Sequence, residues 1–415
     1  ILEKSPTRSK IINDPVHGFI EVPKGTLLHL IDTLDFQRLR RIKQLGQSSL
    51  VYPGAVHTRF NHALGAMHLM RQALDTLRLK DVSITDTEYE GALIAILLHD
   101  IGHGPFSHAL EYAIIKGLHH EDMSLAMMHN LNKKMDGKLS TAIDIFTGKY
   151  PKKFLHQLVS SQLDMDRMDY LIRDSFFTGV VEGVVGIDRI IKVLNVWDGQ
   201  LVCEDKGIYS VEKFVVARRL MYWQVYLHKA AMSAEHMMVN ILSRARELVE
   251  KGDKIFLDDT LEYFFRTPVS PEKLNQEVIE KFIQMDDINI EFALKQWQSA
   301  DDRVLSDLCR RILSRKLLKV RFDDKAFSKE KVKDKSKKFR QKTGFSAKEA
   351  SYYVFKGKIS NQAYLKNSSE PILIYFKSGK VKDLATASDM NNIRALSAPV
   401  TKHFLCFPGN KGSST

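Results

Sequence analysis

The stretch "LLHDIGHGPFSH", residues 97 to 108, sets four ionisable side chains among two glycines and a proline at the end of an apolar run. The run itself, "ALIAILL" at residues 92 to 98, predicts a buried helix. Where such a helix unwinds, an adjacent imidazole and carboxylate can bind one divalent ion of the Mg, Mn or Fe type. His99 and Asp100 are therefore candidate metal ligands. A buried hydrogen bond between them is the simpler alternative, because the dipeptide is weak as a motif.

Composition limits the class of protein. The chain has 415 residues, of which 44% are hydrophobic and 27% are charged, as in soluble globular proteins. No apolar run approaches the ~18 residues that span a membrane, so we exclude a membrane protein. The polar, basic first ten residues do not resemble a signal peptide. The three cysteines lie far apart, which argues against disulfides and a thiolate zinc site and favours a cytoplasmic location.

Apolar residues at three- and four-residue spacing indicate helices from about residue 32 to residue 251. One helix begins near Thr87, which can form a capping box with Glu90. We predict a mostly α fold, a helical bundle with a smaller α+β C-terminal lobe. The predicted strands are "GFIEVP" (18–23), "GQLVCE" (199–204) and "PILIYFKSGKV" (371–381). The predicted division is an N-terminal segment (1–31), a helical core (32–267) and the C-terminal lobe (268–415).

Much of the net charge lies in one segment of the C-terminal lobe. Residues 315–342 hold 13 Lys or Arg and 4 Asp or Glu, a net charge of +9 out of +12 for the chain. The run "KEKVKDKSKKFRQK" favours a basic loop or linker at about 325–345. Such a run can also bind nucleic acid weakly, because phosphate neutralisation alone gives salt-sensitive binding.

A second informative stretch is "SSQLDMDRMDYLIRDS", residues 160 to 175. On a helix, its apolar residues form one stripe that faces a core. The stripe consists of Met165, Met168 and Ile172, and the other faces carry Asp166, Arg167, Tyr170, Arg173 and Asp174. If this helix lines a cleft, Asp166 binds a metal ion while Arg167 and Tyr170 hold an anionic substrate. On a surface helix the same residues would form a solvated, salt-bridged face.

Histidines supply further candidates. His62 lies one helical turn from Arg59, which would place a cation beside a metal-bound substrate. Five of the 15 histidines fall within 22 positions, namely His99, His103, His108, His119 and His120. Neutral imidazoles near pH 7 transfer protons, so such a cluster beside a metal suits phosphoester chemistry. The intervening "GPFS" permits a turn that aims His103 and His108 at one point.

The order His62, His99-Asp100, Asp166, with "HDIGHGPFSH" and "DMDRMDYLIRD", resembles the HD-domain phosphohydrolase superfamily. The stretches "NDPVHGFIEVP" and "IDTLDFQRLRRIKQLGQSSLVYPGAVHTRFNHALG" are similar to the deoxynucleoside triphosphate (dNTP) triphosphohydrolases in particular. The similarity covers roughly residues 10–235. It implies an HD-domain helical bundle that converts a dNTP to a deoxynucleoside and inorganic triphosphate.

The resemblance also implies roles for the residues of the site. One divalent ion (Mg, Mn, Fe, Ni or Zn) would be bound by His62, His99, Asp100 and Asp166. His108 would protonate the departing 5′-oxygen, His103 and His120 would stabilise the phosphates, and Glu121 would orient His120. The substrate would be bound by Gln44, Leu45, Arg59, Arg167, Tyr170, Asp174, Arg218 and Tyr226. Leu45 and Tyr226 would leave no room for a 2′-hydroxyl; ordinary core packing is the alternative for both.

In this family a second nucleotide site lies between subunits, so the resemblance implies GTP or dGTP as an activator and a homo-oligomer, a dimer or tetramer. The matching residues are Lys10, Ile11, Asn13, Asp32, Gln37 and Arg40. The helix expected at "RIIKVLNV" has Asn195 where the vertebrate relatives have an arginine, so this half of the site departs from the family. A salt-bridged helix without a ligand is the alternative for "DFQRLRRIKQ".

Two other functions remain open at this point. The same metal ligands suit an HD phosphodiesterase or nuclease that acts on cyclic nucleotides or single strands, which would not need a wall against the 2′-hydroxyl. A nucleic-acid-binding protein with a relict HD fold is motivated by the basic segment, although all four metal-ligand positions are filled.

Overall fold

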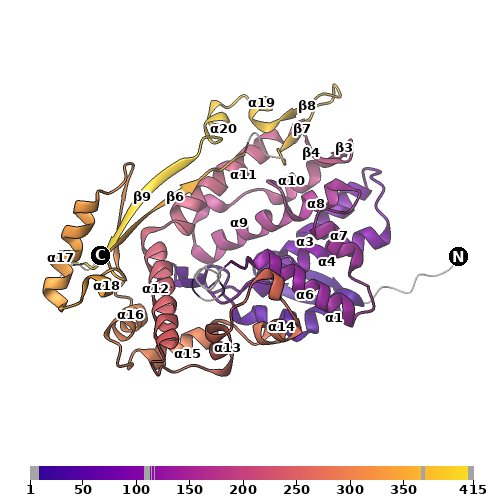
Figure 1. Cartoon of the computed structure of the whole chain (residues 1–415). Coiled ribbons are helices and arrows are strands. Elements are labelled where there is room, and N and C mark those ends of the chain that lie inside the picture. Colours follow the sequence, from indigo (N-terminus) through magenta and orange to yellow (C-terminus); the bar gives the residue numbers. More distant parts are fainter. Residues whose placement is uncertain (1–8, 107–112, 114, 116, 366–369, 410–415) are drawn as a thin grey trace.

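The computed structural model describes residues 9–106, 113, 115, 117–365 and 370–409. Within these ranges helices predominate, and the strands form small sheets (Figure 1). The fold is mostly α with a smaller α+β region, which confirms the predicted fold class. No helix in this part of the chain is long and apolar enough to cross a membrane.

An antiparallel hairpin is the first described element. Its strands are β1 (Ser9–Asp14) and β2 (Gly18–Pro23), so the first predicted strand is confirmed. Ile20 and Val22 of β2 are fully buried, whereas most of β1 is exposed. The hairpin is followed by three short helical segments: α1 (Thr26–Asp32), α2 (Leu34–Gln37) and the 3₁₀ helix η1 (Arg38–Arg41).

The helices between residues 59 and 251 form the core and carry most residues of the candidate site. They are α3 (Arg59–Arg78), α4 (Asp86–Leu98), α6 (His120–Lys134), α7 (Ser140–Phe146), α8 (Lys153–Val159), α9 (Met165–Thr178), α10 (Ile187–Val193), α11 (Ile208–Met221) and α12 (Lys229–Lys251). Helix α9 packs against α3 at close range because Gly65 has no side chain. A Cβ atom at Gly65 would lie 2.0 Å from Oδ1 of Asp169.

Helix α4 is buried on all sides from Gly91 to Leu98, as its apolar sequence predicts. Its capping box pairs Thr85 with Glu88, so the predicted box of Thr87 and Glu90 is wrong. The backbone of Thr85 is extended, and its hydroxyl can therefore accept from the first free N–H groups of the helix, whereas Thr87 already lies inside it.

Two further sheets involve the C-terminal part of the chain. The order β3-β4-β7-β8 joins core strands to strands of that part, and β4 pairs with β7 in parallel; the other sheet has the order β5-β9-β6. These strands are β3 (Leu194–Trp197), β4 (Gln200–Glu204), β5 (Lys319–Asp323), β6 (Phe355–Asn361), β7 (Leu373–Tyr375), β8 (Val381–Asp383) and β9 (Val400–Phe407). The strand predicted near residue 200 is confirmed, whereas the single segment predicted at residues 371–381 contains a turn and forms two antiparallel strands, β7 and β8.

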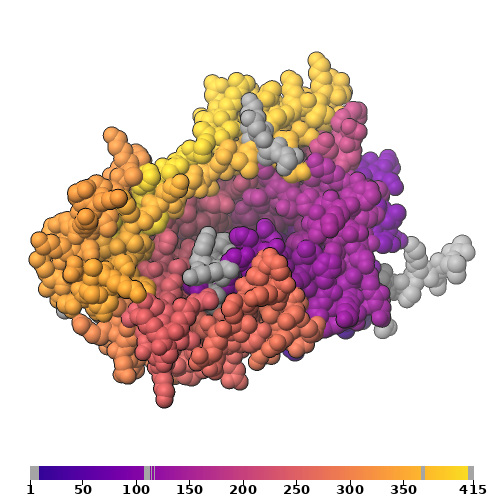
Figure 2. All heavy atoms as spheres, viewed as in Figure 1, coloured from indigo at the N-terminus to yellow at the C-terminus, as the bar shows by residue number. Residues whose placement is uncertain are grey.

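The remaining helices follow α12 in the chain. They are α13 (Asp259–Arg266), α14 (Gln276–Ile283), α15 (Asp287–Trp297), α16 (Arg303–Leu313), α17 (Lys329–Thr343), α18 (Ala347–Ala350), α19 (Leu384–Ala387) and α20 (Asn391–Ala395). The face drawn in Figure 2 is hollowed between the C-terminal strands, in yellow, and the core helices, in purple and red.

Helix α17 occupies the segment for which a basic loop at about 325–345 was predicted, and that prediction is wrong. Ser328 caps its first turn, and Gly344 ends it in the left-handed conformation with φ 70°. Phe339 anchors its inner face in the core. Lysine has a good intrinsic helix propensity, so a lysine-rich run forms a helix when caps and an apolar anchor are present.

Candidate metal centre

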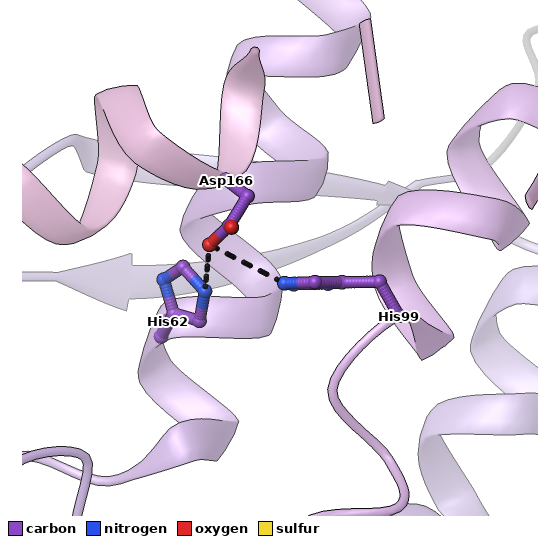
Figure 3. Close-up of side chains that lie close together, drawn as sticks. All are labelled: His62, His99 and Asp166. Atoms are coloured by element: carbon purple, nitrogen blue, oxygen red, sulfur yellow. Dashed lines mark ion pairs between the residues drawn. The ribbon is translucent and has the colours of Figure 1, made fainter. Parts of the chain in front are cut away.

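Three core helices bring the four predicted metal ligands together. His62 lies in α3, His99 and Asp100 directly follow α4, and Asp166 lies in the first turn of α9. Nε2 of His62 is 3.0 Å and Nε2 of His99 is 3.4 Å from Oδ1 of Asp166. Oδ1 of Asp100 is 3.4 Å from Nε2 of His99, and its Oδ2 is 3.9 Å from Nε2 of His62. Figure 3 shows His62, His99 and Asp166 pointing toward one another.

The two imidazoles have the orientation that metal ligands need. Nδ1 of His62 is 2.8 Å from Oδ2 of Asp169, and Nδ1 of His99 is 2.6 Å from the carbonyl oxygen of Ile96. When each Nδ1 donates its proton, the Nε2 atom keeps its lone pair for an ion. Both Nε2 atoms are buried, and both face Oδ1 of Asp166. The residues therefore fit a divalent ion bound by nitrogen and carboxylate oxygen.

The electrostatics of the candidate metal ligands favours a bound cation. Burial disfavours a charged His62, but hydrogen bonds and charges of Asp166 and Asp169 outweigh it and raise the pKa of His62 to about 10. Burial also opposes the ionisation of Asp166, yet hydrogen bonds to His62 and His99 lower its pKa. Protons compensate the carboxylates where no ion is bound, and a divalent ion can replace them.

Asp100 connects the metal ligands to two predicted substrate and catalytic residues. Nη1 of Arg59 donates to Oδ2 of Asp100, and Nε2 of His103 lies 3.3 Å from Oδ1. Burial opposes the ionisation of Asp100, but His99, His103 and Arg59 hold its pKa well below the usual value. Burial and the charge of Arg59 lower the pKa of His103 to about 3, so His103 is neutral near pH 7.

The other predicted catalytic residues follow in the chain. The ring of His120 stacks on His103 with 3.9 Å between centroids. Asp100, His103 and His120 also offer ligand atoms within 4.8 Å of one another. Glu121 is exposed in the first turn of α6. His108 lies outside the described residues, so the predicted convergence of His103 and His108 is not part of the described geometry.

Two of the three predicted substrate-binding arginines lie close to metal ligands along their helices. Arg59 and Arg167 lie on α3 and α9, three residues and one residue from ligands on the same helices. Burial raises the pKa of Tyr170, and the charges of Arg218 and Arg167 oppose this effect. Arg218 is 5% exposed, and its Nε and Nη1 atoms bind no described residue. Buried polar groups normally have a partner, so this guanidinium is suited to an anionic ligand.

Two predicted substrate-binding residues, Asp174 and Tyr226, share a hydrogen-bond network with His57. The hydroxyl of Tyr226 donates to Oδ2 of Asp174 at 2.7 Å, and Nε2 of His57 lies 2.8 Å from Oδ1 of the same residue. Both oxygens of buried Asp174 are thus engaged, and Asp174 fixes the tyrosine hydroxyl. The backbone N–H of Gln44 donates to the carbonyl of His57, and Leu45 packs half-buried against the core. His57 was missed by the sequence analysis.

Asp287, a residue of the predicted C-terminal lobe, supports two loops of the site. Its Oδ2 accepts from the N–H of Lys43 at 2.9 Å, and its Oδ1 accepts from the N–H of Phe106 at 3.3 Å. These loops precede Gln44 and His108. Sequence reasoning missed Asp287, because an acidic residue at a helix start normally indicates a cap.

The residues predicted to bind an activator form two groups on the surface. Lys10, Ile11 and Asn13 are exposed on β1, and Asp32, Gln37 and Arg40 lie on the short helices that follow. Within the second group, Nε of Arg40 donates to Oε1 of Gln37 at 2.8 Å. Asn195 lies on strand β3, not on the expected helix, because the helical part of "RIIKVLNV" ends at Val193.

Comparisons with known proteins agree with the fold. Residues 59–174 match the model of the HD domain, and residues 185–260 match that of an HD-associated region. The matched HD domain begins at Arg59 and ends at Asp174, and it includes all four predicted metal ligands. These segments define the class as that of HD-domain hydrolases.

Similar proteins extend this result. The protein YwfO of Bacillus subtilis is 37% identical over 75% of this chain and 71% of its own length. A deoxynucleoside triphosphate triphosphohydrolase SAMHD1 homolog of Dictyostelium discoideum is 34% identical over 66% of this chain and 58% of its own length. The solved structure of a phosphohydrolase from Bacteroides thetaiotaomicron is 48% identical, covers 97% of this chain and 100% of its own, and has a TM-score of 0.93. The chain belongs to the HD-domain phosphohydrolases and is related to the SAMHD1 dNTPases.

Proposed function

We propose that this phosphohydrolase cleaves dNTPs to a deoxynucleoside and inorganic triphosphate. The observation that carries the proposal is the buried guanidinium of Arg218, whose Nε and Nη1 atoms bind no described residue. Arg218 lies in the last turn of α11, which packs against α9, the helix that supplies Asp166. A buried cation without a partner suits a polyanionic substrate such as a triphosphate. The relationship to the Dictyostelium enzyme supports the same substrate class.

The chain's residues have distinct roles in this reaction. A divalent ion at the four ligands would supply Lewis-acid charge and lower the pKa of water beside the α-phosphorus. Arg59, Arg167 and Arg218 bind and orient the phosphate oxygens, which neutralises charge that builds up in the transition state. His108 protonates the departing 5′-oxygen, while His103 and His120 stabilise the phosphates. Glu121 orients His120.

Selection of the deoxyribose depends on a short wall of side chains. Leu45 and Tyr226 occupy the space of a 2′-hydroxyl, and the bond to Asp174 keeps the tyrosine in place. A fixed wall rejects a larger substrate because neither side chain can yield without losing contacts. Gln44 and Tyr170 contact the sugar beside this wall.

Activation by GTP, dGTP or a dNTP between subunits of a homo-oligomer, a dimer or tetramer, belongs to the same proposal. The hairpin that carries Lys10, Ile11 and Asn13 exposes apolar side chains, with Ile11 62% and Phe19 70% exposed. Two exposed apolar side chains on one hairpin offer apolar surface that an interface between subunits would bury. Asp32 can accept from a guanine edge and Arg40 can donate to its O6 atom. A cytoplasmic location is part of the proposal.

Product analysis tests the reaction. The full chain is incubated with Mn²⁺ or Mg²⁺ and a dNTP mixture, with and without GTP, and the products are separated by ion exchange. We expect inorganic triphosphate and deoxynucleosides, with faster release when GTP is present. Pyrophosphate with deoxynucleoside monophosphate, or turnover of cyclic nucleotides or single strands alone, would instead identify another HD phosphodiesterase or nuclease.

Asp166→Ala tests whether Asp166 is a metal ligand, and Asp144→Ala is its control. Because it removes the oxygen that faces both imidazoles, we expect triphosphate release to fall by at least about 10³-fold, the scale of a lost metal or oxyanion contact. Asp144→Ala removes an exposed carboxylate on α7 and should leave the rate unchanged. Normal turnover by the Asp166 variant would remove this residue from the ligand set.

A further inference from the structure

A buried chain of charged groups connects the β1–β2 hairpin to the candidate metal ligand His62. Oδ2 of Asp169 lies 2.8 Å from Nδ1 of His62, and Oδ1 of Asp169 lies 2.6 Å from Nε2 of His17. Arg173 donates from Nε to Oδ2 of Asp169 at 2.8 Å. The same guanidinium donates from Nη1 to Oδ2 of Asp14 at 2.8 Å. Hairpin, α9 and α3 thus meet in one network.

Burial makes the partners in this network depend on one another. His62, Asp169 and Arg173 are fully buried, and Asp14 is nearly so. A buried charge is stable only when its partner stays in place, because water cannot replace the lost interaction. Without Asp14, Asp169 would be the sole ion-pair partner of Arg173 in this network. The stronger pairing with Arg173 would weaken the hydrogen bond between Asp169 and His62.

Asp14 also stabilises the turn that places His17 beside Asp169. Its Oδ1 accepts from the N–H of Val16 at 3.0 Å and from the N–H of His17 at 2.9 Å. An aspartate that binds the backbone two and three residues ahead fixes a turn locally. The conformation of the hairpin and the support of Asp169 therefore share a single carboxylate.

The network has room only because α3 carries glycine beside it. A Cβ atom at Gly65 would lie 2.0 Å from Oδ1 of Asp169 and 2.2 Å from Nη2 of Arg173. Gly65 follows His62 by less than one helical turn. A methyl group at this position would displace Asp169 and Arg173 without touching a metal ligand.

We propose that Asp14 and His17 of the hairpin are positioning residues of the metal centre, acting on His62 through Asp169 and Arg173. Asp169 keeps the proton of His62 on Nδ1 and so directs the Nε2 lone pair toward the ion. The inference rests on the proposed metal centre.

Metal titration of the full chain tests the inference without measuring turnover. We expect Mn²⁺ affinity, measured by calorimetry, to be about 10- to 100-fold weaker in Asp14→Asn, Asp169→Asn and Gly65→Ala. An asparagine at position 169 can donate to Nδ1 and force the proton of His62 onto Nε2, which then cannot bind the ion. Gly65→Ala raises the helix propensity of α3, so weaker binding in that variant cannot come from a weaker helix.

Glu21→Gln is the matched control. Oε2 of Glu21 accepts from Arg71 of α3 at 3.0 Å, so the variant loses another carboxylate that links the hairpin to α3, outside the network. We expect its Mn²⁺ affinity to equal that of the wild type. The visible spectrum of bound Co²⁺ should change in Asp14→Asn at saturation and stay unchanged in Glu21→Gln, because only the former rotates a ligand.

The outcomes separate this inference from the proposed function. A wild type that binds no Mn²⁺ would overturn the metal centre itself. A wild type that binds Mn²⁺ while Asp14→Asn and Gly65→Ala bind it equally well, with an unchanged Co²⁺ spectrum, would overturn the positioning role alone. If Asp169→Asn does not fold, the other two variants decide the question.

Discussion

Leu45 carries much of the proposed selection against ribonucleotides at the scale of single residues. Because Leu45→Ala shortens the wall against a 2′-hydroxyl, we expect the ratio of dATP to ATP turnover to fall by about tenfold or more. A competition assay with both nucleotides measures this ratio. Leu50→Ala, at the far end of the 3₁₀ helix η2 (Gly46–Leu50), is the control and should keep the wild-type ratio. An unchanged ratio in Leu45→Ala would refute the wall.

Asp287 gives a pH dependence of stability. Burial raises its pKa to about 6 from 3.8, although the N–H groups of Lys43 and Phe106 oppose this effect. The folded protein therefore binds a proton more tightly than the unfolded chain. The resulting stability is full below about pH 4 and is lost as the pH rises through 6.

The melting temperature of the wild type relative to Asp287→Asn measures this effect. As the pH falls from 7 to 5, the wild type should gain the equivalent of about 1 kcal/mol over the variant, because only the wild type takes up the proton. A difference that stays constant over this range would show that Asp287 does not titrate there.

At the residue scale, sequence could predict the candidate metal ligands but not the residues that support them. Motifs at helix ends singled out the two histidines and two aspartates, because metal chemistry restricts the residue types. Asp169 and His57 act through partners more than a hundred positions away in the chain. No local pattern distinguishes such residues from ordinary buried polar groups.

Among the elements, α17 shows where charge patterning misled the sequence analysis. A run of like charges is typical of solvated loops, but the caps at Ser328 and Gly344 and the buried Phe339 stabilise a helix instead. The capping box of α4 shows the same limit, since two threonines two positions apart satisfy the same motif. The long helices were predictable because their apolar periodicity repeats over many residues, whereas the strands β5, β6 and β9 were not predicted.

We expect α17 to bind single-stranded nucleic acid weakly. The side chains of Lys329, Lys333 and Lys337 are exposed, and substituting all three by Gln removes cations from one flank of the helix. Binding should weaken, and the slope of log K against log salt should become shallower by about 2, because fewer counterions are released. Fluorescence anisotropy with a labelled oligonucleotide measures both quantities.

A charge-matched variant serves as the control for α17. Lys133, Lys138 and Lys149 are exposed around α6 and α7, and their substitution by Gln removes the same charge elsewhere. This variant should bind like the wild type. Equal weakening in both variants would indicate an effect of net charge, and no binding by the wild type would exclude a nucleic-acid surface.

In the whole molecule, residues 268–415 contact the helical core through a shared sheet and through helix packing. Strand β7 extends the sheet of β3 and β4, and α16 packs against α12. The predicted boundaries at 1–31, 32–267 and 268–415 stay a prediction. The parallel pairing between β4 and β7 could not be inferred from sequence. The apolar pattern of a strand indicates which of its faces is buried, but not which distant strand lies beside it.

Metal removal should affect the stability of the whole molecule. An ion that binds only the folded state stabilises it by about 2.7 kcal/mol at a hundredfold excess over Kd. We therefore expect Mn²⁺ to raise the melting temperature of the chelator-treated wild type by a few degrees and to leave Asp166→Ala unchanged. An equal rise in both proteins would place the bound ion elsewhere.

The most direct test of the central claim is hydrolysis of dGTP in ¹⁸O-labelled water, followed by ³¹P NMR of the products. Attack of water on the α-phosphorus breaks its bond to the 5′-oxygen, so the account predicts inorganic triphosphate with one ¹⁸O atom on a terminal phosphorus and an unlabelled deoxynucleoside. Label in the 5′-hydroxyl of the deoxynucleoside, or in pyrophosphate or monophosphate products, would contradict it.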